Sequence, residues 1–314
     1  MTDRIGATGS RLLTGNHPLY RGLEEKISLF HLAESCLIYN TGYMANLGLL
    51  AAVGVKEATF LYDLEVHASI YDGMRLSHAK CLPFRHNDLN SLERRLKAAK
   101  RPIFVLIESI YSISGDIAPV REIAKTCTTW GASLIVDEAH ATGVRGPQGE
   151  GLCVECGIED QTFARVHTFS KALGVHGAAV VGSKTLKEYL VNFSRPFIYT
   201  TALPSCALAM IACAYKKLQR EAKEHQHRLG ELIHYFRSKT HSSCDGPIQP
   251  LYISGVERLK NIASKIRESG LDVRAIVPPT TARGNELLRV VLHSFNQEEE
   301  IDKLVEVVFC NESS

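Results

Sequence analysis

Short apolar runs alternate with amphipathic stretches through the first part of the 314-residue chain. Each run is apolar at almost every position, which is typical of strands that are buried on both faces of a parallel sheet. The stretches between them carry apolar residues at helical spacing, and Asp88 stands as a capping residue before one of them. The alternation predicts an α/β fold with a mostly parallel central sheet and helices on both faces. The predicted strands are 36–40, 59–63, 80–84, 103–109, 133–140, 166–169 and 177–183, and the predicted helices are 45–54, 67–77, 88–99 and 119–130.

The pattern changes near residues 205–230. An apolar helical run at 202–215 precedes a strongly polar helical stretch, after which strands and helices follow without the earlier regular alternation. This change predicts a large domain at 1–220 and a smaller C-terminal α+β domain at 221–314.

Composition and charge narrow the class of protein. Apolar residues make up 45% of the chain, and the formal net charge of +2 indicates neither a nucleic-acid partner nor a membrane surface. The start, MTDRIGATGSR, lacks the apolar core of a secretory signal, and the apolar run at 202–215 is too short to span a bilayer. The nine cysteines are scattered, which favours free thiols and a cytoplasmic location.

The segment LIVDEAH places Asp137, Glu138 and His140 at the end of an apolar strand. These polar residues fit a simple exit from the core, but ligands of open parallel sheets also bind at this edge. A nucleotide hydrolase with a DEAH box would need a phosphate loop upstream. The nearest match, GAAVVGSKT at 177–185, lies downstream with the wrong spacing, so a hydrolase is not predicted.

The segment CVEC at 153–156, with nearby histidines, carries residue types that can bind a metal. A zinc site needs four ligands, and no second pair follows at suitable spacing. We therefore predict no metal site.

Asp137 and Lys171 together suit pyridoxal 5′-phosphate. Lys171 lies in HTFSKALGVHG; by itself it fits a surface charge, but a lysine amine can also form a Schiff base with an aldehyde. A carboxylate at a strand end can pair with the pyridine nitrogen of the cofactor. The turn in TGYMANLG at 41–48 offers a helix N-terminus for the phosphate, and Thr168 and Ser170 flank the lysine as hydroxyl donors.

The segment HTFSKALGVHG resembles the lysine signature of the α-oxoamine synthases, which are fold-type I pyridoxal-phosphate-dependent transferases. The resemblance extends in order over nearly the whole chain. It includes GSRLLTGNHPLYRGLE at 9–24, YNTGYMANLG at 39–48, VHASIYDG at 66–73, ESIYSISGDIAPV at 108–120, VDEAHATGVRGPQGEG at 136–151, YTTALP at 199–204 and LLRVVLH at 287–293. Within the family, AIVPPTTARGNELLRV is most similar to the branch that makes 8-amino-7-oxononanoate in biotin synthesis.

The resemblance implies a role for each matching residue. Lys171 is implied as the Schiff-base lysine and the base that takes the substrate α-proton, and Asp137 as the partner of the pyridine nitrogen. His67 is implied to stack on the ring, although by itself it also fits a structural residue at a helix start. His140 and Ser112 are implied to bind the phenolic oxygen of the cofactor or to lie close to it. The phosphate is implied to be held by Gly42, Tyr43, Thr168 and Thr200, the last from a second subunit. Arg289 is implied to bind the substrate carboxylate, although by itself it also fits an arginine at a strand edge.

The implied activity is the decarboxylative condensation of L-alanine with a pimeloyl thioester of coenzyme A or acyl-carrier protein. The implied assembly is a homodimer with shared active sites. A glycine-using sister enzyme, either a 2-amino-3-ketobutyrate ligase or a 5-aminolevulinate synthase, is the alternative within the family. A catalytically silent partner subunit is the alternative of another class, and retention of Lys171, Asp137, His67 and His140 argues against it.

The chain departs from the family at its start. Family members carry an arm and a loop before the GATGSR motif, which here begins at residue 6. We therefore expect that the family's N-terminal arm is missing from the large domain.

Overall fold

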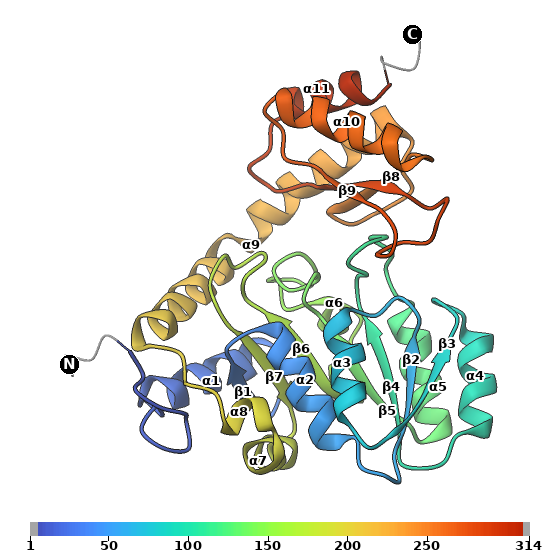
Figure 1. The fold of residues 1–314 in the computed structure, drawn as a ribbon. Coiled ribbons are helices and arrows are strands. Elements are labelled where there is room, and N and C mark those ends of the chain that lie inside the picture. Colours follow the sequence, from blue (N-terminus) through green and yellow to red (C-terminus); the bar gives the residue numbers. More distant parts are fainter. Residues whose placement is uncertain (1–5, 310–314) are drawn as a thin grey trace. The chain divides into compact units, whose positions relative to one another are not determined.

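The computed structural model describes residues 6–309, which form two compact units (Figure 1). Residues 6–110 and 118–222 make up the first unit, and residues 111–117 with 223–309 make up the second. Helix α9 (Ser205–Thr240) is continuous over 36 residues and contributes to both units. The apolar run and the polar stretch that follows it are therefore parts of one helix.

The first unit is built on a seven-stranded sheet with the order β1-β7-β6-β5-β4-β2-β3. Strands β2 to β6 pair in parallel, and β7 pairs antiparallel with both β1 and β6. The prediction of a mostly parallel sheet is confirmed. The strands are β1 (Ser35–Tyr39), β2 (Thr59–Asp63), β3 (Lys80–Phe84), β4 (Ile103–Glu108), β5 (Ser133–Asp137), β6 (Thr162–Thr168) and β7 (Ala178–Gly182).

Strand β7 runs antiparallel because its connection is short. Only residues 169–177 separate it from β6, whereas a parallel neighbour needs a crossover of a dozen or more residues. The strand predicted at 133–140 ends earlier, at Asp137, because the Asp137 carboxylate accepts the N–H of Ala139 at 2.9 Å and turns the chain.

Helices cover both faces of the sheet. Thr168 lies against the start of α2 on one face, and the adjacent His167 stacks on His31 at the other face. Asp88 caps α4 by accepting the Ser91 N–H at 2.9 Å, as predicted. The helices are α1 (Leu19–Phe30), α2 (Gly42–Val53), α3 (Ala68–Leu76), α4 (Leu89–Ala98), α5 (Val120–Trp130), α6 (Leu152–Glu155), α7 (Lys184–Phe193) and α8 (Arg195–Ile198), with a 3-10 turn at Glu159–Gln161.

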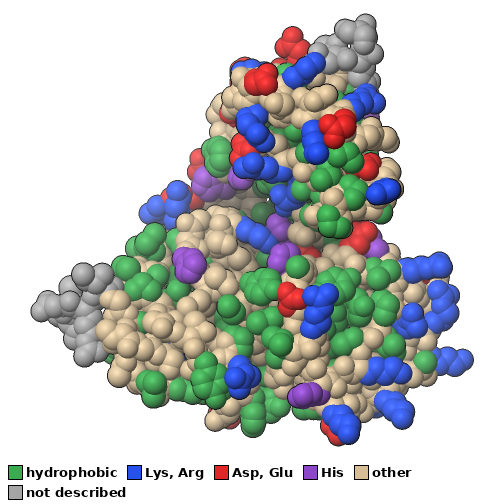
Figure 2. Space-filling view, in the orientation of Figure 1, with side chains coloured by type: hydrophobic (Ala, Val, Ile, Leu, Met, Phe, Trp, Pro, Cys, Tyr) green, Lys and Arg blue, Asp and Glu red, His purple; other side chains and the backbone are tan. Residues whose placement is uncertain are grey.

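The outer strand β3 carries features that protect a sheet edge. It contains Lys80 and Pro83, and Lys and Arg side chains gather over α4 and the adjoining edge of the sheet (Figure 2). Charge and proline at an edge prevent pairing with another chain. Among the described residues, no helix combines the length and hydrophobicity that crossing a bilayer requires. The described cysteines are free thiols.

The second unit is a small α+β structure. Its antiparallel sheet has the order β8-β10-β9, formed by β8 (Ile248–Tyr252), β9 (Arg274–Ile276) and β10 (Leu287–Val291). Helices α10 (Val256–Glu268) and α11 (Glu298–Phe309) pack against each other. Segment 111–117 joins this unit because Gly115 approaches the Ile248 backbone and Cys244 Sγ contacts Ser114 O at 3.4 Å.

Candidate active site

Polar side chains converge at the carboxyl edge of the parallel strands in the first unit. Asp137 is the last residue of β5 and Thr168 is the last residue of β6. Gly42 opens α2, and His67 caps α3. This is the edge at which ligands bind in open α/β sheets.

Asp137 is buried and rigidly held. The residue is only 5% exposed to solvent. One carboxylate oxygen, Oδ1, accepts the Ala139 N–H at 2.9 Å, and the other, Oδ2, accepts from Asn46 Nδ2 at 2.7 Å. Because both oxygens accept hydrogen bonds from fixed donors, the direction of the carboxylate is set by the fold.

His67 lies close to both Asp137 and Lys171. Burial lowers the pKa of His67, the Asp137 carboxylate acts in the opposite direction, and the Lys171 charge lowers the pKa further. His67 Nδ1 contacts Ser69 Oγ at 2.8 Å and accepts the Ser69 N–H at 3.2 Å. The Tyr43 ring stands edge-on to the imidazole, with ring centroids 6.5 Å apart.

The start of α2 forms a narrow cradle with Thr168. The first N–H groups of a helix, here those of Gly42 and Tyr43, have no acceptor within the helix, and anions bind to such groups. A methyl group on Gly42 would lie 2.1 Å from Thr168 Oγ1, so only glycine fits beside this hydroxyl. The Tyr43 hydroxyl is not part of this cradle, because it donates to the Asp72 carboxylate.

Lys171 lies in the loop of residues 169–177 between β6 and β7, with its side chain exposed. The loop is tight: Val175 N donates to Phe169 O at 3.1 Å, and Gly177 adopts a φ of +130° against the buried Phe169 ring. The small residues near the lysine therefore allow this close turn. His140 is half-buried on the turn after β5.

Three predicted site residues, Arg289, Ser112 and Thr200, do not lie at the strand ends described above. Arg289 and Ser112 both belong to the second unit, where Arg289 Nε donates to the Ser112 carbonyl at 2.6 Å. Thr200 is half-buried after α8, and the next residue, Thr201, bridges to Ser10 and accepts from Asn40 Nδ2 at 2.8 Å.

Asn46 and Ser69 contact the predicted site residues but were not predicted. Asn46 is 3% exposed and Ser69 is fully buried. A signal for Asn46 is present in the sequence, because it is a single amide inside the apolar helix GYMANLGLLAAV. A buried amide needs partners, which indicates a polar contact at this point of the helix.

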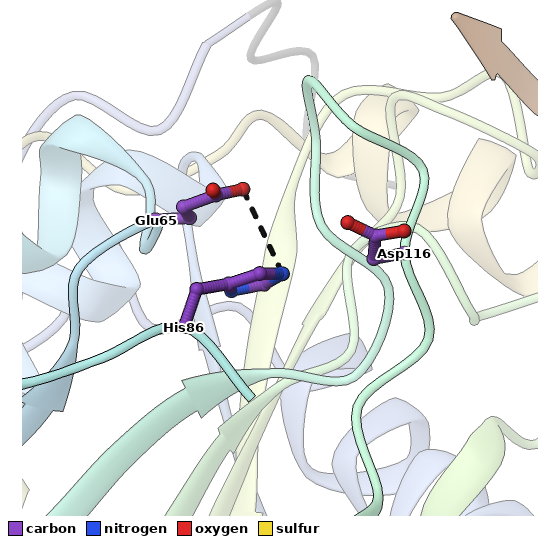
Figure 3. A group of neighbouring side chains, drawn as sticks. All are labelled: Glu65, His86 and Asp116. Atoms are coloured by element: carbon purple, nitrogen blue, oxygen red, sulfur yellow. Dashed lines mark ion pairs between the residues drawn. The ribbon is translucent and has the colours of Figure 1, made fainter. Parts of the chain in front are cut away.

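No metal site was predicted. Figure 3 labels Glu65, His86 and Asp116, of which Glu65 and His86 belong to the first unit. Glu65 and His86 form an ion pair with a separation of 3.7 Å, drawn as a dashed line in Figure 3. The other ring nitrogen of His86, Nδ1, contacts the buried Asp63 carboxylate at 2.9 Å. Asp116 belongs to the second unit. The histidine therefore has carboxylate partners at both ring nitrogens.

The donor set of the first unit fits pyridoxal phosphate. It provides a lysine amine, a buried carboxylate of fixed direction, a histidine, and a helix N-terminus beside a hydroxyl. These groups match the aldehyde, the pyridine nitrogen, the ring face and the phosphate of that cofactor.

Known proteins resemble the chain over nearly its whole length. The profile of the aminotransferase class I and II family matches residues 1–308. An 8-amino-7-oxononanoate synthase of Emericella nidulans is 41% identical, over 96% of this chain and 79% of that protein. An 8-amino-7-oxononanoate synthase of Marinobacter nauticus is 36% identical, over 96% of this chain and 78% of that protein.

Solved structures share the fold. A serine palmitoyltransferase of S. paucimobilis with a bound PLP–myriocin aldimine superposes with a TM-score of 0.92 at 30% identity, over 98% of this chain and 79% of that one. An 8-amino-7-oxononanoate synthase of Francisella tularensis gives a TM-score of 0.83 at 27% identity, over 94% and 88%. The predicted fold-type I architecture and the predicted family resemblance are confirmed. The chain belongs to the aminotransferase class I and II family.

Proposed function

We propose that this chain is a pyridoxal 5′-phosphate-dependent acyltransferase. It condenses L-alanine with a pimeloyl thioester to give 8-amino-7-oxononanoate, carbon dioxide and the free thiol, as a step of biotin synthesis in the cytoplasm. The observation that carries the proposal is the convergence of Asp137, His67 and the Lys171 charge at the strand ends. The 41% identity to a synthase of this name supports the choice of reaction.

Each residue of the first unit has a defined task in this proposal. Bound pyridoxal phosphate supplies an aldehyde for the substrate amine and a ring that withdraws the electron pair left when the Cα–H bond breaks. Lys171 holds the cofactor between turnovers and takes the α-proton on Nζ. Asp137 keeps a proton on the pyridine nitrogen, which makes the ring a stronger electron acceptor. His67 packs on the ring, and His140 binds its phenolic oxygen.

The remaining contacts bind the phosphate and the substrate. The N–H groups of Gly42 and Tyr43 and the hydroxyl of Thr168 hold the phosphate, and Arg289 holds the substrate carboxylate through paired hydrogen bonds. Ser112 assists at the phenolic oxygen. We further propose a homodimer in which Thr200 of each copy reaches the phosphate of the other.

The choice of amino acid separates this proposal from the nearest alternatives. A TM-score measures the course of the backbone and does not distinguish alanine from glycine or serine as the substrate. The identity to the Emericella nidulans synthase is 41%, compared with 30% to the serine palmitoyltransferase, which favours alanine. Thiol release should be measured with alanine, glycine and serine against pimeloyl thioesters of coenzyme A and of acyl-carrier protein. Strict use of glycine or serine would refute the alanine assignment.

The cofactor proposal has a direct spectroscopic test. Purified protein mixed with pyridoxal phosphate should develop the visible absorbance of a lysine-bound cofactor, and Lys171→Ala should abolish it. Lys184→Ala is the matched control, since Lys184 is an exposed lysine just after β7. A spectrum without this band, or a band unchanged in Lys171→Ala, would refute the enzyme proposal and favour a silent subunit.

A further inference from the structure

A continuous chain of hydrogen bonds links Asp137 to His67 through two buried residues. Asn46 Nδ2 lies 2.7 Å from Asp137 Oδ2 and 2.9 Å from Ser69 Oγ. Ser69 Oγ in turn lies 2.8 Å from His67 Nδ1. The four residues come from β5, α2, the start of α3 and its cap, and all belong to the first unit.

The chemistry of the groups sets the direction of each bond. A carboxylate oxygen accepts hydrogen bonds, so the NH₂ group of Asn46 donates one of its hydrogens to Asp137 Oδ2. The second amide hydrogen of Asn46 is directed to Ser69 Oγ. The Ser69 hydroxyl hydrogen is then available for His67 Nδ1. The backbone N–H of Ser69 also donates to Nδ1, at 3.2 Å. With two donors aimed at it, Nδ1 carries no proton, and the proton of the neutral ring is on Nε2.

Close packing of α2 against α3 brings these residues into register. A methyl group on Gly73 of α3 would lie 3.0 Å from Leu50 Cβ and 3.1 Å from Asn46 O, so the two helices nearly touch there. Ser69 is one turn before Gly73, and Asn46 is one turn before Leu50. The glycine contact therefore places Ser69 opposite Asn46.

We propose that Asn46 and Ser69 are positioning residues that couple the Asp137 carboxylate to the His67 ring and fix the proton of His67 on Nε2. The inference rests on the proposed function, in which Asp137 and His67 contact the same cofactor ring. Asn46 holds the carboxylate in the direction that meets the pyridine nitrogen. Ser69 holds the plane of the His67 imidazole. Because Asn46 bonds both Asp137 and Ser69, this one buried amide positions both the carboxylate and the imidazole. The lowered pKa of His67, caused mainly by burial, agrees with a neutral imidazole.

Two variants test the link. Ser69→Ala removes the hydroxyl, and Asn46→Leu removes both amide bonds at similar volume. Loss of one or two such bonds should raise the Kd for pyridoxal phosphate about fivefold in Ser69→Ala and about tenfold in Asn46→Leu. In ¹⁵N-histidine spectra of the cofactor-free and loaded protein, wild-type His67, assigned with His67→Gln, should show an unprotonated Nδ1 and a protonated Nε2. In both variants these signals should move toward the average of the two tautomers.

Ser91→Ala is the matched control. Ser91 is a buried serine in the first turn of α4, where its hydroxyl accepts the Arg85 N–H at 3.1 Å. Its loss should lower stability while leaving the His67 signals and the cofactor Kd unchanged. Ser69→Thr, which keeps the hydroxyl, should retain the wild-type tautomer. If Ser69→Ala does not fold, Asn46→Leu decides the question.

The outcomes separate this inference from the proposed function. If the wild type binds the cofactor and both variants match Ser91→Ala in His67 signals and Kd, the positioning role is refuted while the proposed function stands. If the wild type takes up no cofactor, the proposed function fails. The histidine spectra of the cofactor-free protein then still show whether the Asn46–Ser69 link fixes the His67 proton.

Discussion

Replacing Gly42 by alanine tests the cradle between α2 and β6. The added Cβ would lie 2.1 Å from Thr168 Oγ1, 3.3 Å from Thr168 Cβ and 3.4 Å from Thr168 Cγ2. Thr168 is 9% exposed at the end of a central strand, so it has little room to move away. Overpacking of this kind costs about 1–3 kcal/mol.

The expected net effect includes a smaller opposing term. Alanine in place of glycine in a helix contributes about 0.5–1 kcal/mol of stability through lower backbone entropy. We therefore expect Gly42→Ala to lower the free energy of unfolding by about 1–2 kcal/mol. Gly22→Ala in α1 should do the opposite and raise it by about 0.5–1 kcal/mol, because nothing lies within 4 Å of a Cβ at that position.

Urea unfolding of the two variants and the wild type measures the difference. In a Thr168→Ala background, Gly42→Ala should lose most of its cost, because the clashing hydroxyl is gone, which gives a coupling energy of about 2 kcal/mol. A Gly42→Ala variant as stable as Gly22→Ala, or one with the same cost in both backgrounds, would refute the steric reasoning.

Three further predictions concern buried histidine and close glycine contacts. Burial lowers the pKa of His31 from 6.5 to about 3. Between these pH values the unfolded state therefore binds a proton that the folded state does not. The free energy of unfolding should fall by up to about 1.4 kcal/mol for each unit that the pH decreases in this range. Urea titrations at several pH values should show a shallower dependence in His31→Gln, and equal slopes would contradict this assignment. Gly73→Ala places a Cβ 3.0 Å from Leu50 Cβ and should cost about 1–2 kcal/mol in chemical unfolding, whereas a gain in stability would show that α2 and α3 separate easily. Gly151→Ala combines a φ of +120° with a Cβ 2.0 Å from Glu138 Oε2 and should cost at least about 2 kcal/mol; a thermal melt like that of the wild type would exclude the clash.

Most strands could be predicted from the sequence because each is a short apolar run with polar ends. Strands β2 and β3 occupy the predicted residues, 59–63 and 80–84. Helix α1 was not predicted, although Tyr20, Leu23 and Ile27 give it a buried stripe at helical spacing. Its start has no side-chain cap hydrogen bond, so the usual N-terminal signal is missing.

Strand ends and motifs in the sequence predicted candidate site residues, and two of these residues stand at strand ends in the structure. Asp137 and Thr168 end strands, and the carboxyl edge of a parallel sheet collects such residues. Ser69 was not predicted, because a serine at a helix start resembles an ordinary capping residue. Its contact with Asn46 depends on how α3 lies against α2.

The sequence by itself determined the types of the elements and the positions at which reactive groups leave the apolar core, because local hydrophobicity and turn chemistry depend on near neighbours along the chain. Only the tertiary structure decided which polar groups meet. Asn46 and Asp137 are 91 residues apart in the sequence. Their hydrogen bond requires helix α2 to pack on the sheet with Asn46 beside the end of strand β5. Hydrogen bonds depend on distance and direction within a few tenths of an ångström, and no pattern along a single sequence contains that information.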